Sequence, residues 1–286
     1  MAVTPEELLH DGRLDEALVA LQERVRKDAA NPKLRTFLFQ LLAVRGEWER
    51  ALTQLNVAAD LDPASLAMAQ TYREALACEA FRTSVFAGER SPVVLGNPAQ
   101  WTAELLDALR LAGQGEFAAS QSLRDRAFAA APAVSGSLNG ERFEWIADAD
   151  PRLGPMIEVV LNGRYCWVPF ANVSEIRLEP PTDLRDLVWL PAEFTWSNGG
   201  EMVGLIPARY PGSERAADDR VRLARRTDWI DQGADLFFGL GQRLLATDQG
   251  EYPLFEVREI CFDATGAGAE DSPDEEARRD GPAAAE

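Results

Sequence analysis

The feature that most constrains the fold is a repeat in the N-terminal half. Residues 12–18 (GRLDEAL) recur as residues 46–52 (GEWERAL), an offset of 34 residues, and a weaker copy begins at Gly115. A helix-turn-helix unit of this period is the tetratricopeptide signature. Each glycine is expected to end the first helix of a pair, because glycine readily adopts the left-handed conformation that closes a helix. We therefore predict that residues 1–132 form an all-α domain of tetratricopeptide-like helical hairpins.

The second half has the spacing of β-strands. Residues 156–161 and 164–169 are β-prone runs joined by Asn162-Gly163, a dipeptide typical of a type I′ turn because both central residues need positive φ. Residues 197–200 (SNGG) and 247–250 (TDQG) indicate two more hairpins, the latter joining residues 242–246 to 254–262. These signals predict an antiparallel β-rich domain, with closure into a barrel left open.

Domain boundaries follow from the changes in composition. The small, polar segment 133–140 (AVSGSLNG) is the predicted linker, and residues 141–263 are the predicted β-rich domain. Residues 264–286, rich in Ala, Gly, Asp and Glu, are predicted to be a disordered acidic tail. The predicted fold class is α+β with two domains.

Charge and composition exclude several classes of function. The formal net charge is −18 and neither half is basic, so a nucleic acid is not an expected partner. The chain has no apolar run of about 18 residues and no secretory signal at its start, so neither a membrane span nor a membrane partner is expected. The three cysteines are widely spaced and odd in number, which is typical of a reducing compartment. We predict a cytoplasmic protein.

Asp148, Asp150 and Arg152 are the strongest candidates for chemistry. A carboxylate pair suits acid–base work or a divalent cation. Such a site needs further ligands, and His10 is the only histidine of the chain. The favoured interpretation is a structural turn, in which each aspartate accepts backbone hydrogen bonds and the arginine pairs with an acid. We predict a protein with no catalytic residue, metal or cofactor, and the alternative is a metal-dependent hydrolase centred on these three residues.

Aromatic and arginine residues recur through the second half. Its tryptophans are expected to lie mostly in the core, with an interface role as the alternative; they are Trp145, Trp167, Trp189, Trp196 and Trp229. Arg209 and Arg226 stand beside aromatic residues and are expected to stack on them and pair with the acidic turn. The predicted structural motif therefore comprises Asp148, Asp150, Arg152, Gly163, Trp167, Arg209, Arg226 and Trp229.

Several long segments carry a family resemblance. Residues 145–170 (WIADADPRLGPMIEVVLNGRYCWVPF) resemble the hallmark segment of the ImpE/TagJ family, also described as SciE-type virulence proteins, which are accessory proteins of bacterial type VI secretion. So do residues 184–192 (LRDLVWLPA), 206–214 (IPARYPGSE), 225–229 (RRTDW) and 241–251 (GQRLLATDQGE). Their order and spacing fit the family over most of residues 12–262.

The resemblance implies a cytoplasmic, non-catalytic adaptor. Family members associate with TssB, the small subunit of the contractile sheath, and some associate with the N-terminal domain of the ATPase ClpV through an N-terminal helix. The matching stretch here is residues 5–21, and its candidate contacts are Leu8, Leu9, Leu14, Leu18 and Leu21. The same leucines are equally what a first helical hairpin needs for its own packing.

Overall fold

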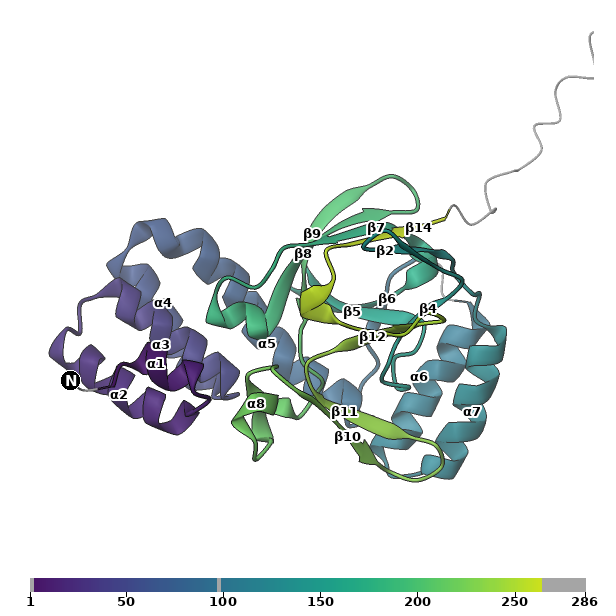
Figure 1. Ribbon diagram of the computed structural model, residues 1–286, viewed down its shortest axis with the longest axis horizontal. Coiled ribbons are helices and arrows are strands. Elements are labelled where there is room, and N and C mark those ends of the chain that lie inside the picture. Colours follow the sequence, from purple (N-terminus) through teal and green to yellow (C-terminus); the bar gives the residue numbers. More distant parts are fainter. Residues whose placement is uncertain (1–2, 97–98, 264–286) are drawn as a thin grey trace, which may run out of the picture.

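The computed structural model describes residues 3–96 and 99–263, and the predicted tail lies outside these described residues. Helices fill the first half of the chain and strands the second, so the fold class is α+β as predicted (Figure 1). Seven of the described helices precede β2, in the order α1 (Pro5–His10), α2 (Leu14–Lys27), α3 (Pro32–Val44), α4 (Trp48–Leu61), α5 (Leu66–Phe86), α6 (Gln100–Gly113) and α7 (Phe117–Ala130). None of the helices in this part of the chain is long and apolar enough to cross a membrane.

The repeat locates the turns between helices correctly. Gly12, Gly46 and Gly115 follow α1, α3 and α6, and their φ values are 73°, 72° and 82°. This left-handed conformation costs glycine little, so the chain can reverse there. One stripe of α2 is buried at helical spacing, namely Leu14, Ala17, Leu18, Leu21 and Val25. This stripe places α2 in the helical core as the periodicity predicts.

A nine-stranded sheet follows the helices, with the strand order β1-β6-β5-β9-β8-β7-β14-β2-β3. Its strands are β1 (Val93–Val94), β2 (Gly136–Leu138), β3 (Glu141–Phe143), β5 (Met156–Leu161), β6 (Arg164–Pro169), β7 (Val173–Leu178), β8 (Trp189–Trp196), β9 (Glu201–Pro207) and β14 (Glu259–Phe262). Asn162 and Gly163 join β5 to β6 with φ values of 48° and 73°, which confirms the predicted hairpin turn.

The sheet answers the question of closure and differs from the expected one in two ways. Among the described residues it does not close into a barrel, because β1 and β3 are its two edges. It is not purely antiparallel, because β1, from the half predicted to be all helical, pairs in parallel with β6. Strand β2 lies within the predicted linker and pairs with β14. Two- and three-residue strands such as these are stabilised by their neighbours in the sheet, so the local sequence carries little sign of them.

The predicted hairpin turn at residues 247–250 is confirmed, but its second strand is not residues 254–262. Strand β12 (Leu244–Thr247) pairs across this turn with β13 (Glu251–Pro253), and on its other side with β4 (Ile146–Asp148), forming a separate three-stranded sheet. After Pro253 the chain makes a 3-10 turn and enters β14 of the larger sheet. A two-stranded sheet of β10 (Thr227–Asp231) and β11 (Phe237–Gly241) follows the short helix α8 (Asp219–Arg222).

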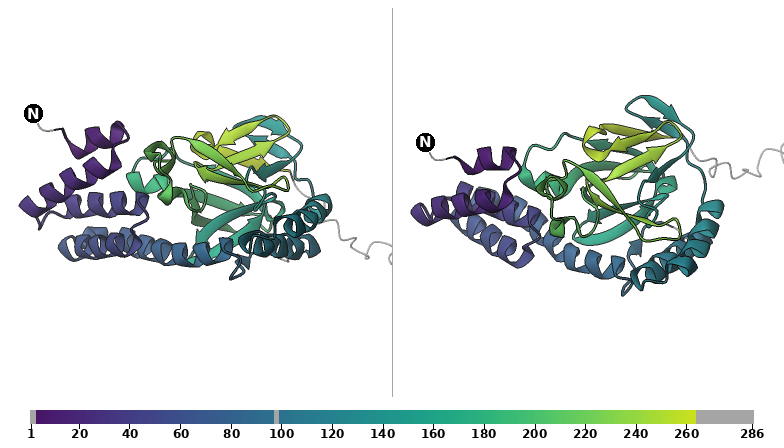
Figure 2. Two further views of the ribbon diagram at one scale, coloured as in Figure 1. Left: turned by 90° about the horizontal axis from the view of Figure 1, so that it is seen from below. Right: turned by 60° about the horizontal axis from the view of Figure 1, so that its bottom comes forward.

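The nine-stranded sheet separates two cores. Helix α5 runs along one face, where it joins the outer helices to the strands (Figure 2). Met156 and Val160 of β5 belong to the core on this side, whereas Ile157 and Val159 belong to the second core, together with residues of the three-stranded sheet. Because both faces are covered, every residue of β5 is buried. One of them, Glu158, is charged and faces α5.

Candidate functional site

Glu158 is the centre of a buried network of charges between α5 and the sheet. Arg82 of α5 donates to its two carboxylate oxygens from Nε and Nη2, at 2.6 and 2.9 Å. The Tyr165 hydroxyl donates at 2.5 Å, and Arg243 also forms an ion pair with Glu158. Burial by itself raises the pKa of Glu158, but the two arginines outweigh it and the pKa falls to about 2. Glu158 is therefore held ionised.

Arg243 links Glu158 to the acidic turn. Its side chain is fully buried, pairs with both Asp148 and Glu158, and donates from Nε to the Pro207 carbonyl at 2.9 Å. Asp148 also accepts a hydrogen bond from the Tyr210 hydroxyl at 3.0 Å. Burial raises the pKa of Asp148 to about 6, against the opposing effect of Arg243. The folded protein therefore loses the Asp148 proton near neutral pH.

The network ends at Glu79 on α5. Glu79 accepts a hydrogen bond from the indole N–H of Trp189 at 2.8 Å and lies 3.6 Å from Arg82. Burial raises the pKa of Glu79. We call Glu79, Arg82, Asp148, Glu158 and Arg243 the charge network; each is at most 7% exposed. Removing one member would leave its partner charged and unsatisfied in a dry interior, which is costly.

Asp148, Asp150 and Arg152 form a turn. The Asp150 carboxylate accepts from the Arg152 backbone N–H at 2.9 Å and from the Gly239 N–H at 3.0 Å. The Arg152 guanidinium pairs with it at 2.5 Å and lies 4.0 Å from the ring centre of Phe238. Asp148 accepts from the Asp150 N–H at 2.8 Å. These are the bonds that the turn interpretation requires.

The hydrolase alternative needs a carboxylate that substrate can reach. Asp148 is 3% exposed and Asp150 is 0% exposed. Their oxygens accept from backbone amides and arginines, as described above. Within residues 3–96 and 99–263, neither belongs to a group of side chains spaced to hold a metal ion. The geometry of these residues is therefore that of a structural network.

The expected role of two arginines was wrong. Arg209 donates to the carbonyl of Val44, at the end of α3, at 2.8 Å, and Arg226 pairs with Asp228 at 2.6 Å. Neither is bonded to the acidic turn. Arg152 and Arg243 fill that place, and Arg243 and Glu158 were both missed as site residues. The signal for Glu158 was a charge in the middle of an apolar strand, which demands a buried partner, whereas Arg243 lies just before β12 and had no such local signal.

The other residues of the predicted motif have separate positions. Gly163 turns the hairpin close to α5, where a Cβ would lie 3.0 Å from the Glu74 carboxyl group. Trp167 is fully buried and donates from Nε1 to the Tyr165 hydroxyl at 2.7 Å. Trp229 is 37% exposed and packs against Tyr210, with ring centres 5.5 Å apart. Of the five tryptophans of this half, only Trp167 and Trp189 are fully buried.

The five N-terminal leucines lie in the helical core. The most exposed of them, Leu18, has only 8% of its surface accessible. Arg225, from the sheet half, donates to the Leu9 and His10 carbonyls at 3.0 and 2.7 Å. The Leu14 N–H, at the start of α2, donates to Asp219 at 3.0 Å. In this conformation the leucines pack within the molecule.

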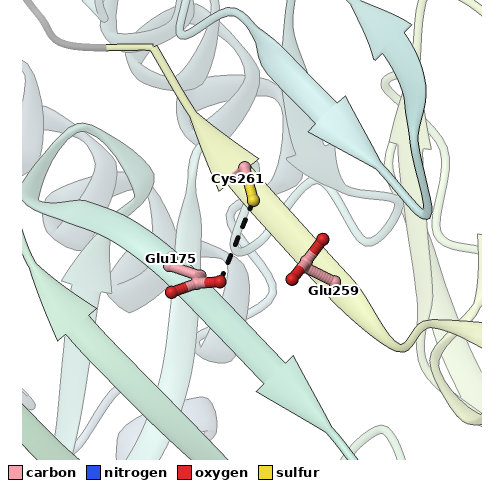
Figure 3. A group of neighbouring side chains, drawn as sticks. All are labelled: Glu175, Glu259 and Cys261. Atoms are coloured by element: carbon pink, nitrogen blue, oxygen red, sulfur yellow. Dashed lines mark hydrogen bonds between the residues drawn. The ribbon is translucent and has the colours of Figure 1, made fainter.

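Among the described residues, the side chains spaced to hold a metal ion are Glu175, Glu259 and Cys261, on β7 and β14 (Figure 3). Both glutamates already pair with Arg177, at 2.7 and 3.6 Å. Burial raises the pKa of the Cys261 thiol, which disfavours the thiolate that binds metals. In this group the two glutamates therefore share one arginine on the sheet surface.

Comparisons with known proteins agree with the resemblance found in the sequence. The family described as ImpE protein matches residues 140–261. The type VI secretion system accessory component TagJ of Pseudomonas aeruginosa is 54% identical over 267 residues, which cover 93% of this chain and 94% of that protein. The crystal structure of protein VPA1032 from Vibrio parahaemolyticus superposes with a TM-score of 0.82 at 25% identity, covering 92% of this chain and 98% of the other. The chain therefore belongs to the ImpE family, together with TagJ.

Proposed function

We propose that this protein is a non-catalytic adaptor of a bacterial type VI secretion system and that it works in the cytoplasm by binding other proteins. The observation that carries the proposal is the 54% identity, over 93% of the chain, to a protein named as an accessory component of that system. The enclosed carboxylates support a role without catalysis. The consecutive helical pairs support a role in binding, because tetratricopeptide-type pairs present extended surfaces to partners.

The proposed partners are the sheath subunit TssB and the N-terminal domain of ClpV. The ClpV contact would use residues 5–21, with Leu8, Leu9, Leu14, Leu18 and Leu21 as the apolar anchors. Since all five are buried against the molecule's own helices, this contact requires the N-terminal helices to leave their place. Helix α1 has only six residues and is tied to the sheet half by the two Arg225 hydrogen bonds. It is the natural element to be released.

Purified components test both contacts separately. We expect the full chain to retain TssB on an affinity column, and a chain lacking residues 1–11 to retain TssB but to lose the ClpV N-terminal domain. A Val203→Ala variant is the control, because Val203 lies on β9, is 66% exposed and stands outside residues 5–21. A folded full chain that retains neither protein would contradict the proposal.

The hydrolase alternative is tested in solution. We expect no heat of binding with Mg²⁺, Mn²⁺ or Ca²⁺ that depends on Asp148, and an Asp148→Asn variant should alter stability alone. A cation that binds the full chain but does not bind a folded Asp148→Asn variant would support the hydrolase alternative.

A further inference from the structure

An apolar pocket of about 450 Å³ lies between the C-terminal end of α7 and the outward face of the three-stranded sheet β13-β12-β4. Of the charge network only Asp148 is among its lining residues, and no residue of α1 or α2 lines it. Two large side chains stand at its margin and are partly exposed, Phe128 at 37% and Trp145 at 41%. Exposed aromatic residues beside a pocket are typical of interaction sites.

The floor of the pocket is made of small side chains. In the register of the sheet, Ala147 of β4 lies opposite Ala246 of β12, so their methyl groups share one face. Ala149 follows two residues after Ala147 and lies on the same side of the chain, whereas Asp148 between them points into the interior. Methyl groups fill little space, so the floor is low enough for a bulky side chain to rest on it.

The walls are held in place by the acidic turn. Gly154, with φ of 51°, lies so close to Phe128 that a Cβ would meet the ring at 2.4 Å. The Gly154 carbonyl accepts from the Asp148 N–H at 2.7 Å, and its own N–H donates to the Asp150 carbonyl at 3.1 Å. Pro151 of the same turn also lines the pocket. The pocket is thus formed before any partner arrives, which lowers the entropic cost of binding.

The rim is acidic. Glu251 of β13 lies opposite Ala246 in the register and is exposed. Glu144, next to Trp145, is exposed, and its N–H donates to the carboxylate of the exposed Asp248 at 2.8 Å. The whole chain carries a net charge of −18. A second copy of this chain or an anionic lipid surface would be repelled, whereas a basic partner would be attracted.

From this geometry we propose that the pocket is a docking site for a basic amphipathic segment of a protein partner. A leucine, phenylalanine or tryptophan of the segment inserts over Ala147 and Ala246, between Phe128 and Trp145. Lysines or arginines flanking it lie against Glu144, Asp248 and Glu251. The inference does not depend on which secretion component is the partner.

The test uses a fluorescein-labelled synthetic helical peptide of leucines and lysines, added to the full chain, with fluorescence anisotropy as the readout. We expect saturable binding that Ala246→Leu weakens by about tenfold, because the added side chain fills the floor. Ala118→Leu adds the same side chain to an exposed position of α7 outside the pocket and should leave the affinity unchanged. Equal affinities of the two variants would overturn the proposal.

A second pair of variants examines the rim. At low salt, Glu144→Gln combined with Glu251→Gln should weaken binding about threefold to tenfold. The control combines Glu49→Gln with Glu89→Gln, which are exposed on other parts of the surface and remove the same charge. If both doubles lose affinity equally, the peptide senses only the net charge and the site is refuted.

A third variant, Trp145→Ala, keeps the test decisive if the Ala246→Leu variant fails to fold. This side chain is 41% exposed, so its removal should leave the fold intact. We expect it to weaken binding of the leucine–lysine peptide about tenfold. Unchanged affinity in a folded Trp145→Ala variant would count against the pocket irrespective of the behaviour of Ala246→Leu.

Discussion

Two sheet faces of this molecule contrast in chemistry and in access. Between α5 and the nine-stranded sheet, Glu158 of β5 meets Arg82 of α5 and Arg243, which precedes β12, and all three side chains are buried. The outward face of the three-stranded sheet carries Ala147 and Ala246, and it opens into a pocket. The first holds buried, paired charges, and the second has an apolar floor with an acidic rim.

The contrast teaches that charged motifs and accessible sites need not coincide. Because the buried charges are paired and hydrogen-bonded, they fix how α5 lies on the strands. The acidic turn connects the two faces, since Asp148 belongs to the network while Gly154 supports the wall of the pocket. The charges therefore help to position the apolar surface of the pocket.

The largest expected effect tests whether the sealed face depends on its charges. Arg243→Leu leaves Asp148 and Glu158 buried without their shared cation, so the free energy of unfolding should fall by about 3–5 kcal/mol. Urea unfolding followed by tryptophan fluorescence measures it. Arg215→Leu, at a side chain that is 76% exposed, should change it by less than about 0.5 kcal/mol. A loss below about 1 kcal/mol for Arg243→Leu would show that the buried charges do not hold the sealed face together.

The pH dependence should identify Asp148. Its pKa is raised from 3.8 to about 6, so between pH 6 and pH 4 the folded state holds a proton that the unfolded state lacks. Its contribution to the free energy of unfolding therefore grows as the pH falls through this window, to about 3 kcal/mol at most. The difference in unfolding free energy between wild type and Asp148→Asn should increase from pH 7 to pH 4. A constant difference would contradict the assignment.

Glu158 should behave in the opposite sense. Its pKa is lowered from 4.5 to about 2, so its stabilising contribution is complete above pH 4.5 and is lost as the pH falls towards 2. We therefore expect acid unfolding of the wild type to occur between pH 4.5 and pH 2 and not between pH 6 and pH 4.5. This difference in pH range distinguishes Glu158 from Asp148.

A smaller effect is expected at the other end of the network. Trp189→Phe removes the indole N–H that donates to Glu79, leaving a buried carboxylate less well satisfied, and should cost about 1–2 kcal/mol. Trp145→Phe, at a partly exposed side chain, should cost less than about 0.5 kcal/mol. We therefore expect Trp189→Phe to lower the free energy of unfolding more than Trp145→Phe does. The reverse order in urea unfolding would contradict the contrast between the two faces.

The smallest expected change in global stability is at the N-terminal helix. Arg225→Ala removes the donors to the last carbonyls of α1 and should lower the free energy of unfolding by about 1 kcal/mol or less. Hydrogen exchange within residues 5–12 should nevertheless become faster, while α5 stays protected. Arg220→Ala, whose partner Asp218 lies in the same short segment, is the control. Unchanged exchange in α1 would show that these bonds do not hold it.

Much of the local structure was predictable because its cause is local. The glycines at 12, 46 and 115 end helices through their own backbone freedom, and Asn162-Gly163 sets the register of β5 and β6. The second strand of the β12 hairpin was not predictable, because residues 251–253 and 254–262 could both follow the turn. The 3-10 turn after Pro253 ends β13 and leads the later residues away from β12. The burial of Leu8 and Leu9 was not predictable either, because the apolar face of an amphipathic helix can pack on the protein's own core or on a partner.

By itself the sequence determined the succession of helices then strands, the positions of their turns, the acidic balance of charge and the family. These follow from backbone preference, periodicity and composition, which act over a few residues or over the whole chain. Only the tertiary structure decided that Arg243 meets both Asp148 and Glu158, and that the alanines of β4 and β12 line a pocket beside α7. The reason is physical: whether a charge is paired or a face is open depends on groups distant in the chain, whose meeting no local preference encodes.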